Sequence, residues 1–167
     1  MIEVEIDSIR VSLMSEHRVI VLKALEKELY LPIWIGPYEA EAIAIRLKNV
    51  DISRPLTHDL LNNVIGEMGG DISNIVVNDL RDDTFYALIN VDVRGTKLEI
   101  DSRPSDAIAL AVRAGVPIFV AEGVMERASI TPEEDITEDA QGAQEEEEDL
   151  SAFRDFVEGL DLDDLSS

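Results

Sequence analysis

The sequence predicts an α+β domain with a mixed, largely antiparallel sheet of about six to seven strands and three main helices. Three observations lead to this fold class. Near the N-terminus, apolar and polar residues alternate with the period of two that strands have. Three later segments open at a proline and carry apolar residues at helical spacing. The other apolar runs are short and bounded by turn residues, as in strands.

The first 35 residues predict a three-stranded antiparallel meander. Ile2, Val4 and Ile6 alternate with acidic residues, and the alternation resumes in the opposite phase from Ile9. A β-bulge near Asp7 and Ser8 would reconcile the two phases. The second strand covers 19–22 and the third 29–35.

Two helices follow. Gly36-Pro37 ends the third strand and opens a helix over 38–49. The second helix follows Ser53-Arg54-Pro55 and ends at Gly69-Gly70. We expect its buried stripe to consist of Leu56, Leu60, Leu61, Val64, Ile65 and Met68. Three further strands are expected over 72–80, 85–93 and 97–101.

The third helix is expected over 107–112, after Pro104, with Gly115 as its C-terminal stop. It is apolar almost all the way round, which predicts an inner helix. Ser102 is expected to cap it. The acids and arginine around this helix start could be a capped turn or part of an active site, and both interpretations stay open. A strand at 118–120 and a short helix near 124–127 complete the domain.

The composition is strongly acidic, with 36 acidic and 14 basic residues and a net charge of -22. Residues 1–131, the expected folded domain, hold 21 of the acids and 13 of the bases. Acidic excess with only four lysines suggests a halophile's cytoplasm, where salt screens the repulsion between acids. An ordinary acidic protein with an acidic tail is the alternative.

The chain after residue 131 predicts two further segments. Residues 132–149 are rich in acids and poor in apolar side chains, which predicts a disordered linker. In residues 150–167, Leu150, Phe153, Phe156, Val157 and Leu160 fall on one face of a short amphipathic helix. We expect this helix to dock on its own domain or on a protein partner.

Several classes of protein are excluded or disfavoured. The chain has no cysteine, which excludes disulfides, thiolate catalysis and Cys-ligated zinc. It shows no phosphate-binding glycine loop and no nucleophile elbow. No apolar run approaches the length of a membrane span, and the N-terminus does not resemble a signal peptide. We therefore expect a cytoplasmic protein that does not contact a membrane.

His58 is the first candidate for chemistry, because Arg54, Asp59 and Asn62 lie within two helical turns of it. A histidine in such a group could transfer protons near neutral pH, whereas the alternative is a solvated helix face. His17, in an expected turn, is interpreted as a surface residue. Trp34 and Tyr38 could stack on a base, although packing at the Gly36-Pro37 corner is the favoured interpretation.

Four carboxylates near helix starts form the second candidate group. A divalent ion such as Mg²⁺ or Mn²⁺ needs only one or two carboxylates besides water and a substrate phosphate. Arg54 and Arg103 could then hold a phosphate while charge develops on it. The candidate metal ligands are Glu39, Glu41, Asp101 and Asp106. Carboxylates are also common at helix starts for capping alone.

Three segments together resemble the bifunctional nuclease family. They are LPIWIGPYEAEAIA (31–44), RPLTHDLLNNVI (54–65) and LEIDSRPSDAIALAVRAGVPIFV (98–120). The resemblance implies an α+β domain that self-associates and an activity on both RNA and DNA. With the acidic composition, it suggests a haloarchaeal-type member. The family motifs fall on Glu39 and Glu41, on Arg54, Thr57, His58 and Asp59, and on Asp101, Ser102, Arg103, Ser105 and Asp106.

Two hypotheses about function follow. The first is a metal-assisted nuclease acting on RNA and DNA, with His58, Asp59, Arg54 and Arg103 as catalytic residues. The second is a non-catalytic, homo-oligomeric binding or scaffold domain whose tail recruits a protein partner.

Overall fold

Seven strands form one mixed sheet in the computed structural model, which describes residues 1–11 and 18–131. The strands are β1 (Ile2–Val11), β2 (Arg18–Ala24), β3 (Tyr30–Ile35), β4 (Gly70–Arg81), β5 (Thr84–Val93), β6 (Thr96–Ser102) and β7 (Ile118–Val120). The helices of the described chain are α1 (Pro37–Leu47), α2 (Thr57–Glu67), α3 (Pro104–Ala114) and α4 (Glu122–Ala128). The strand order is β3-β2-β1-β7-β4-β5-β6. The predicted α+β class and mixed sheet are confirmed, and α4 is the short helix expected near 124–127.

Strand pairing is antiparallel except between β4 and β7, which run parallel. The predicted meander of β1, β2 and β3 is confirmed. The predicted β-bulge is confirmed as well, because the register of β1 on β2 shifts between Ile6 and Ser8. Asp7, the residue between them, has no partner on β2, and this extra residue lets both halves of β1 direct apolar side chains to the same face.

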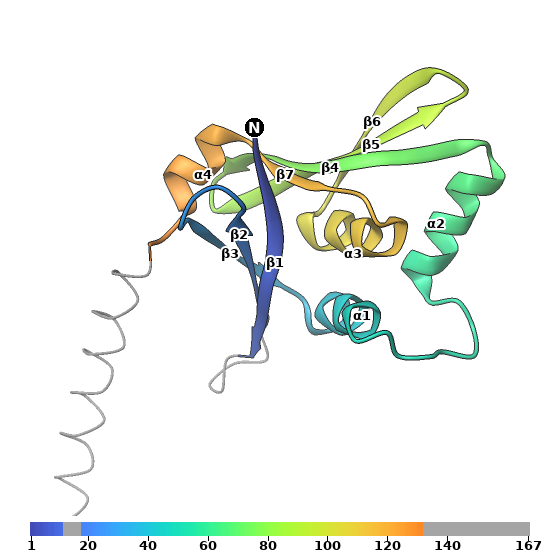
Figure 1. The fold of residues 1–167 in the computed structure, drawn as a ribbon, viewed down its shortest axis with the longest axis horizontal. Coiled ribbons are helices and arrows are strands. Elements are labelled where there is room, and N and C mark those ends of the chain that lie inside the picture. The colour runs from blue at the N-terminus through green and yellow to red at the C-terminus, as the bar shows by residue number, and fades with distance from the viewer. Residues whose placement is uncertain (12–17, 132–167) are drawn as a thin grey trace, which may run out of the picture. The chain divides into compact units, whose positions relative to one another are not determined.

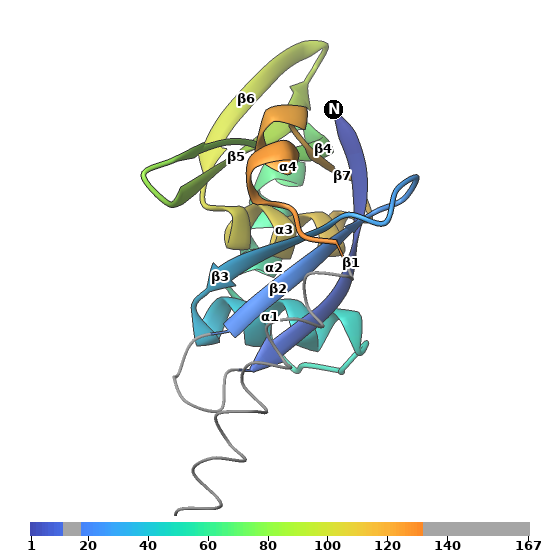
Figure 2. The ribbon, with the colours of Figure 1, turned by 90° about the vertical axis from the view of Figure 1, so that its left-hand side faces the viewer.

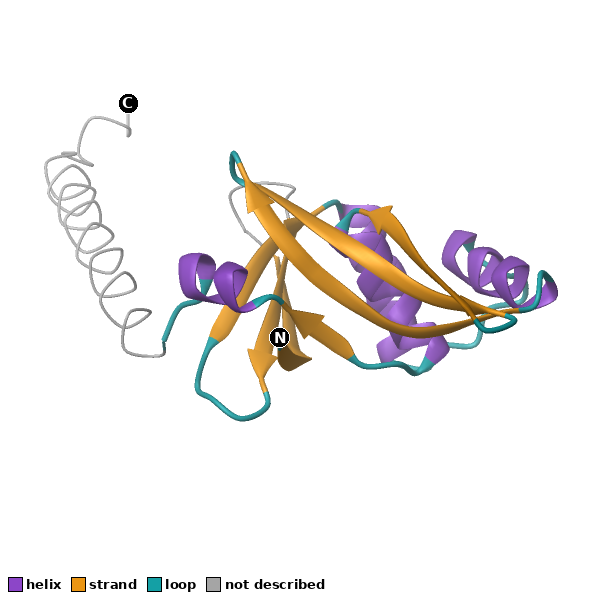
Figure 3. Cartoon of the chain, turned by 90° about the horizontal axis from the view of Figure 1, so that it is seen from above, coloured by secondary structure: helices purple, strands orange, loops and turns teal. Residues whose placement is uncertain are grey.

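Helix α3 is the centre of the fold. Residues 107–111 are at most 1% exposed, which confirms the predicted inner helix. Figure 1 shows α3 beneath β4 and β7, while α1 and α2 pack against it from two sides. Figures 2 and 3 show β1, β2 and β3 turning steeply away from β4 and β5, so that the sheet curls around α3. Alanines at 107, 109 and 111 allow this close approach, and Gly115 ends the helix with a φ of 69°.

The predicted buried stripe of α2 is wrong for four of its six residues, since only Leu56 and Ile65 are partly buried. Leu60 is 57% exposed and Met68 is 71% exposed, and Leu61 and Val64 are also exposed. The helix turns inward the face that carries His58, Asp59, Asn62 and Ile65, and of these only His58 is fully buried. Helical spacing showed that α2 has an apolar stripe, but it could not show whether anything covers that stripe.

Two smaller expectations also fail. Ser102 does not cap α3: its Oγ donates to the carbonyl of Ala87 at 3.3 Å, and the N-cap residue is Arg103. Trp34 and Tyr38 do not pack into the corner at Gly36, because they are 63% and 82% exposed.

The remaining expectations fall outside the structure. The linker at 132–149, the amphipathic segment at 150–167 and His17 lie outside the described residues. Of the helices that the structure describes, none has the length and apolar character of a membrane span.

Candidate active site

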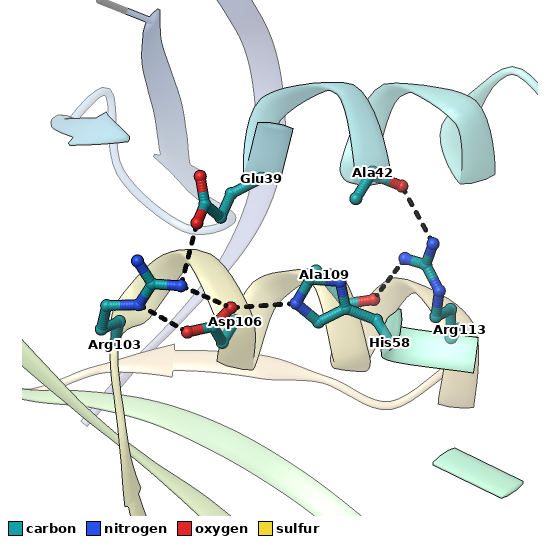
Figure 4. A network of polar contacts seen from close by, with 7 residues as sticks. All are labelled: Glu39, Ala42, His58, Arg103, Asp106, Ala109 and Arg113. Atoms are coloured by element: carbon teal, nitrogen blue, oxygen red, sulfur yellow. Dashed lines mark hydrogen bonds and ion pairs between the residues drawn. The ribbon is translucent and has the colours of Figure 1, made fainter. Parts of the chain in front are cut away.

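The first turns of three helices meet at one place. Glu39 lies in the first turn of α1, His58 in that of α2, and Asp106 in that of α3. Helices α1 and α3 begin with a proline, Pro37 and Pro104, whose fixed φ and missing N–H suit that position, whereas Pro55 precedes Leu56, the N-cap of α2. Because α1 and α2 both pack on α3, their starts bring these side chains together, although they come from distant parts of the chain (Figure 4).

Asp106 is the hub of this cluster. Its Oδ1 lies 2.9 Å from Nε2 of His58, and its Oδ2 accepts from Nε of Arg103 at 2.7 Å. Nη2 of Arg103 donates to Oδ1 of Asp106 at 3.1 Å and to Oε1 of Glu39 at 2.9 Å. The Asp106 carboxylate therefore joins helices rather than capping its own.

The environment keeps Asp106 ionised. Burial alone would raise the pKa of its carboxyl group, but hydrogen bonds from Arg103 and His58 outweigh this effect and hold the pKa below its usual value. The same contact with Asp106 raises the pKa of the Arg103 guanidinium. A fixed carboxylate is consequently available to orient the His58 ring.

Arg113 holds the three helices in this arrangement. Its side chain is 4% exposed, and its Nε donates to Oδ1 of Asp59 at 2.7 Å. Its Nη1 donates to the carbonyl of Ala109 and its Nη2 to the carbonyl of Ala42, at 2.8 and 3.1 Å. Arg113 thus connects α3 to both α2 and α1. Sequence analysis missed it, although it stands out as a lone base in an otherwise apolar helix.

Asp59 binds Arg113 and does not belong to the cluster around Asp106. Its Oδ2 accepts from the backbone N–H of Leu56 at 2.8 Å, which caps the start of α2. Burial opposes ionisation, but the bonds from Leu56 and Arg113, helped by the charge of Arg46, lower the pKa of Asp59. The geometry gives this residue a structural role.

A cavity of about 620 Å³ opens over the Asp106 cluster. Its size lies within the range of small-molecule sites. The polar and aromatic side chains around it are Tyr38, Glu39, Glu41, Thr57, His58, Arg103 and Asp106. Tyr38, which the sequence favoured as a packing residue, is therefore an exposed aromatic group at the edge of the site. We call this cavity, the candidate active site, the catalytic pocket, after the function proposed for it below.

Besides Asp59, two further predicted site residues lie outside the catalytic pocket. Arg54 lines a neighbouring cavity and not the catalytic pocket. Asp101 is exposed on β6, paired with Leu88, and does not line the catalytic pocket.

The predicted metal ligands do not form one coordination group. Asp101 is separate, and Glu39 and Asp106 are both bonded to Arg103. Among the residues that the structure describes, no three His, Asp or Glu side chains are placed to hold a metal ion together.

Comparison with known proteins shows the family. Residues 20–133 match the family model of the bifunctional nuclease domain. An uncharacterized protein of Mycobacterium tuberculosis is 36% identical over 165 residues, covering 99% of this chain and 98% of that protein. "Bifunctional nuclease 2" of Arabidopsis thaliana is 32% identical over 108 residues, covering 62% of this chain and 33% of the plant protein.

"Bifunctional nuclease 1" of Oryza sativa subsp. japonica is 30% identical over 108 residues, with the same coverage. The chain spans about a third of the length of these plant proteins, whereas it matches the mycobacterial protein almost end to end. These relatives are mycobacterial and plant proteins, and they give no support to a haloarchaeal type. The match to the domain model covers well over half of the sequence, so the chain belongs to the bifunctional nuclease domain family.

Proposed function

We propose that this protein is a nuclease that hydrolyses phosphodiester bonds of RNA and DNA in the catalytic pocket. The observation that carries the proposal is the contact between His58 and Asp106, two residues 48 positions apart that meet at the floor of that pocket. The plant relatives are named bifunctional nucleases, which supports the reaction class.

His58 is the proton-transfer group in this proposal. When its Nε2–H donates to Asp106, the neutral ring keeps an acceptor lone pair on Nδ1. Within the described part of the chain Nδ1 has no hydrogen-bond partner, so it is available to take a proton from an attacking water molecule. Asp106 stabilises the imidazolium that forms, which is why its low pKa matters.

Arg103 is the phosphate-binding group. Its side chain is 66% exposed, and its Nη1 makes no hydrogen bond to the described residues. A guanidinium fixed on one side by two carboxylates can donate from its free side to a phosphate oxygen as charge develops there. Tyr38, at the edge of the pocket, offers a face on which a nucleobase can stack.

A divalent ion, Mg²⁺ or Mn²⁺, remains part of the proposal as an ion that enters with the substrate phosphate. Such an ion needs one or two protein carboxylates, and Glu41 lines the pocket without an ion pair to any described residue. Because the described residues supply no three-ligand group, we assign no step of the reaction to the metal.

The test is hydrolysis of end-labelled single-stranded RNA and DNA by the purified full chain, with Mg²⁺, with Mn²⁺ and with EDTA. We expect cleavage by the parent protein and a loss of about 10²–10⁴-fold in kcat for His58→Ala. Glu126→Gln, at an exposed position on α4, is the control for handling and purity. Equal rates for the parent protein and His58→Ala would remove the proposed role of His58.

A second candidate function, self-association as a binding domain, is favoured by one observation. The apolar face of α2, formed by Leu60, Leu61, Val64 and Met68, is exposed. On β6, Leu98 and Ile100 are 44% and 43% exposed and lie beside the core residues Val91 and Ile89 of β5. Ile65 packs near Val91 above Gly70, so the two exposed sets adjoin the same side of the sheet. Exposed apolar side chains gathered on two elements in this way are typical of interaction sites.

Sedimentation of the full chain tests the second candidate. We expect Leu60→Glu with Val64→Glu to shift the protein toward the monomer, whereas Leu25→Glu, at an equally exposed leucine elsewhere, should not. A parent protein that is monomeric at all concentrations would contradict self-association. Nuclease activity and self-association are independent outcomes, so each experiment decides one candidate.

A further inference from the structure

A second cavity, of about 440 Å³, lies next to the catalytic pocket. The two cavities share Ile45 and Pro55 among their lining residues. Arg54 and His58, one in each lining, are four positions apart, so their Cα atoms lie within about 14 Å of each other. A single nucleic-acid strand of a few nucleotides can reach from one cavity to the other.

The second cavity is basic in an acidic protein. Three arginines, Arg46, Arg54 and Arg113, line it against two carboxylates, Asp51 and Asp59. Arg113 and Asp59 neutralise each other through their 2.7 Å contact. Arg46, whose charge also acts on Asp59, and Arg54 then remain against Asp51. The catalytic pocket is acidic by comparison, because three carboxylates line it against Arg103 and His58.

The side chains of Arg46 and Arg54 are available to a ligand. Both residues are exposed, and neither makes a salt bridge within the described residues. Arg46 makes a single long contact, from Nε to the carbonyl of Val112 at 3.4 Å, and Arg54 makes none to the described chain. Asn49, Ser53 and Asn63 add neutral donors to the same lining. Planar guanidinium groups with neutral donors beside them suit a phosphate group.

We propose that this cavity is a phosphate subsite, where Arg46 and Arg54 bind a backbone phosphate of a single-stranded nucleic acid whose scissile bond lies in the catalytic pocket. The proposal rests on the proposed nuclease function. It assigns binding of the polyanion to the basic cavity and bond cleavage to the acidic one. Arg54 is consequently a substrate-binding residue rather than a partner of Arg103 on the reacting phosphate.

The first experiment measures binding alone, with a phosphorothioate thymidine oligonucleotide of about twelve residues that resists hydrolysis. Fluorescence anisotropy gives its Kd with the full chain over a series of salt concentrations. The logarithm of the binding constant falls with the logarithm of salt by about 0.7 for each phosphate contact to a single strand. We expect the slope to become shallower by about 0.7 in Arg54→Ala, and by about twice that in Arg46→Ala with Arg54→Ala.

The control is Arg10→Ala, which removes the same charge from an exposed position on β1 that lines neither cavity. It should leave the slope unchanged. Arg54 is exposed and makes no hydrogen bond or ion pair to the described residues, so the single variant keeps the test valid even if the double variant is unstable. The proposal is overturned if Arg54→Ala has the slope of Arg10→Ala, or if the parent chain does not bind the oligonucleotide at any salt concentration.

The second experiment separates this proposal from the nuclease function. On a cleavable oligonucleotide, Arg54→Ala should raise KM about tenfold, as for the loss of about 1.4 kcal/mol of binding, and leave kcat unchanged. Arg10→Ala, whose side chain lines neither cavity, should match the parent in both KM and kcat. A chain that binds through Arg54 but cleaves nothing would refute the nuclease and keep the subsite. A chain that cleaves with an unchanged KM in Arg54→Ala would refute the subsite and keep the nuclease.

Discussion

Replacing Arg113 by methionine tests how the site is held together. Methionine keeps much of the apolar stem but removes the three donors that join α3 to Asp59, to the carbonyl of Ala42 and to the carbonyl of Ala109. All three bonds have the charged guanidinium as their donor, and a bond of this class is worth about 1.5–3 kcal/mol, although such values do not add. Removing one partner of a buried pair costs about 3–5 kcal/mol. Since the Asp59 side chain is 25% exposed and water can reach it, we expect a loss of about 3–4 kcal/mol.

The assay is urea unfolding followed by far-UV circular dichroism, since Trp34, the single tryptophan, is already exposed. Thermal unfolding is the second readout: a domain of this size loses about 4 °C in Tm for each kcal/mol, so Tm should fall by about 12–16 °C. Arg113→Lys, which keeps the charge but not the fork of donors, should lose less than Arg113→Met. Arg10→Met, at an exposed position, should stay within about 0.5 kcal/mol of the parent. If Arg113→Met loses less than about 1 kcal/mol, the three helices are held by other contacts and this reasoning is refuted.

Two further predictions concern stability. Asp59 has a lowered pKa in the folded state, so its contribution is complete above its usual value of 3.8 and is lost as the pH falls through the lower folded value. Asp59→Asn should therefore be less stable than the parent at pH 7, and the difference measured by urea unfolding should close in acid; a constant difference would contradict the assignment. Gly70→Ala should lose about 1–3 kcal/mol, because an added Cβ would lie 3.0 Å from both Ile65 and Val91. Gly66→Ala, with nothing within 4 Å of its Cβ, should instead gain up to about 1 kcal/mol, and equal thermal shifts for the two variants would refute the packing argument.

Local sequence patterns were sufficient to predict most of the helices and strands of the fold. The bulge near Ser8 follows from a change in the phase of alternation, and the burial of α3 follows from the unbroken apolar run over 107–112. Both features are properties of a short stretch of chain. The prediction that the α2 stripe is buried was wrong, because spacing describes one helix, whereas burial depends on what packs against it.

The site was only partly predictable. His58 and Asp106 were candidates by residue type, but their contact depends on how α2 and α3 pack, which spacing does not specify. Arg54 and Arg103 look equivalent, since each stands between a serine and a proline that opens a helix. In the structure Arg103 is the N-cap of α3, whereas the N-cap of α2 is Leu56, two residues after Arg54. This offset places the two guanidinium groups in different cavities.

The role of Asp106 is tested most directly by Asp106→Asn, which keeps the shape of the side chain and removes its charge. Hydrolysis of a single-stranded oligonucleotide should show a loss of about 10²-fold or more in kcat with little change in KM, because asparagine cannot stabilise the His58 imidazolium. Asp71→Asn, which removes an exposed carboxylate from β4, should leave kcat unchanged. An Asp106→Asn variant that keeps at least half of the parent's kcat would contradict the role of the His58–Asp106 pair.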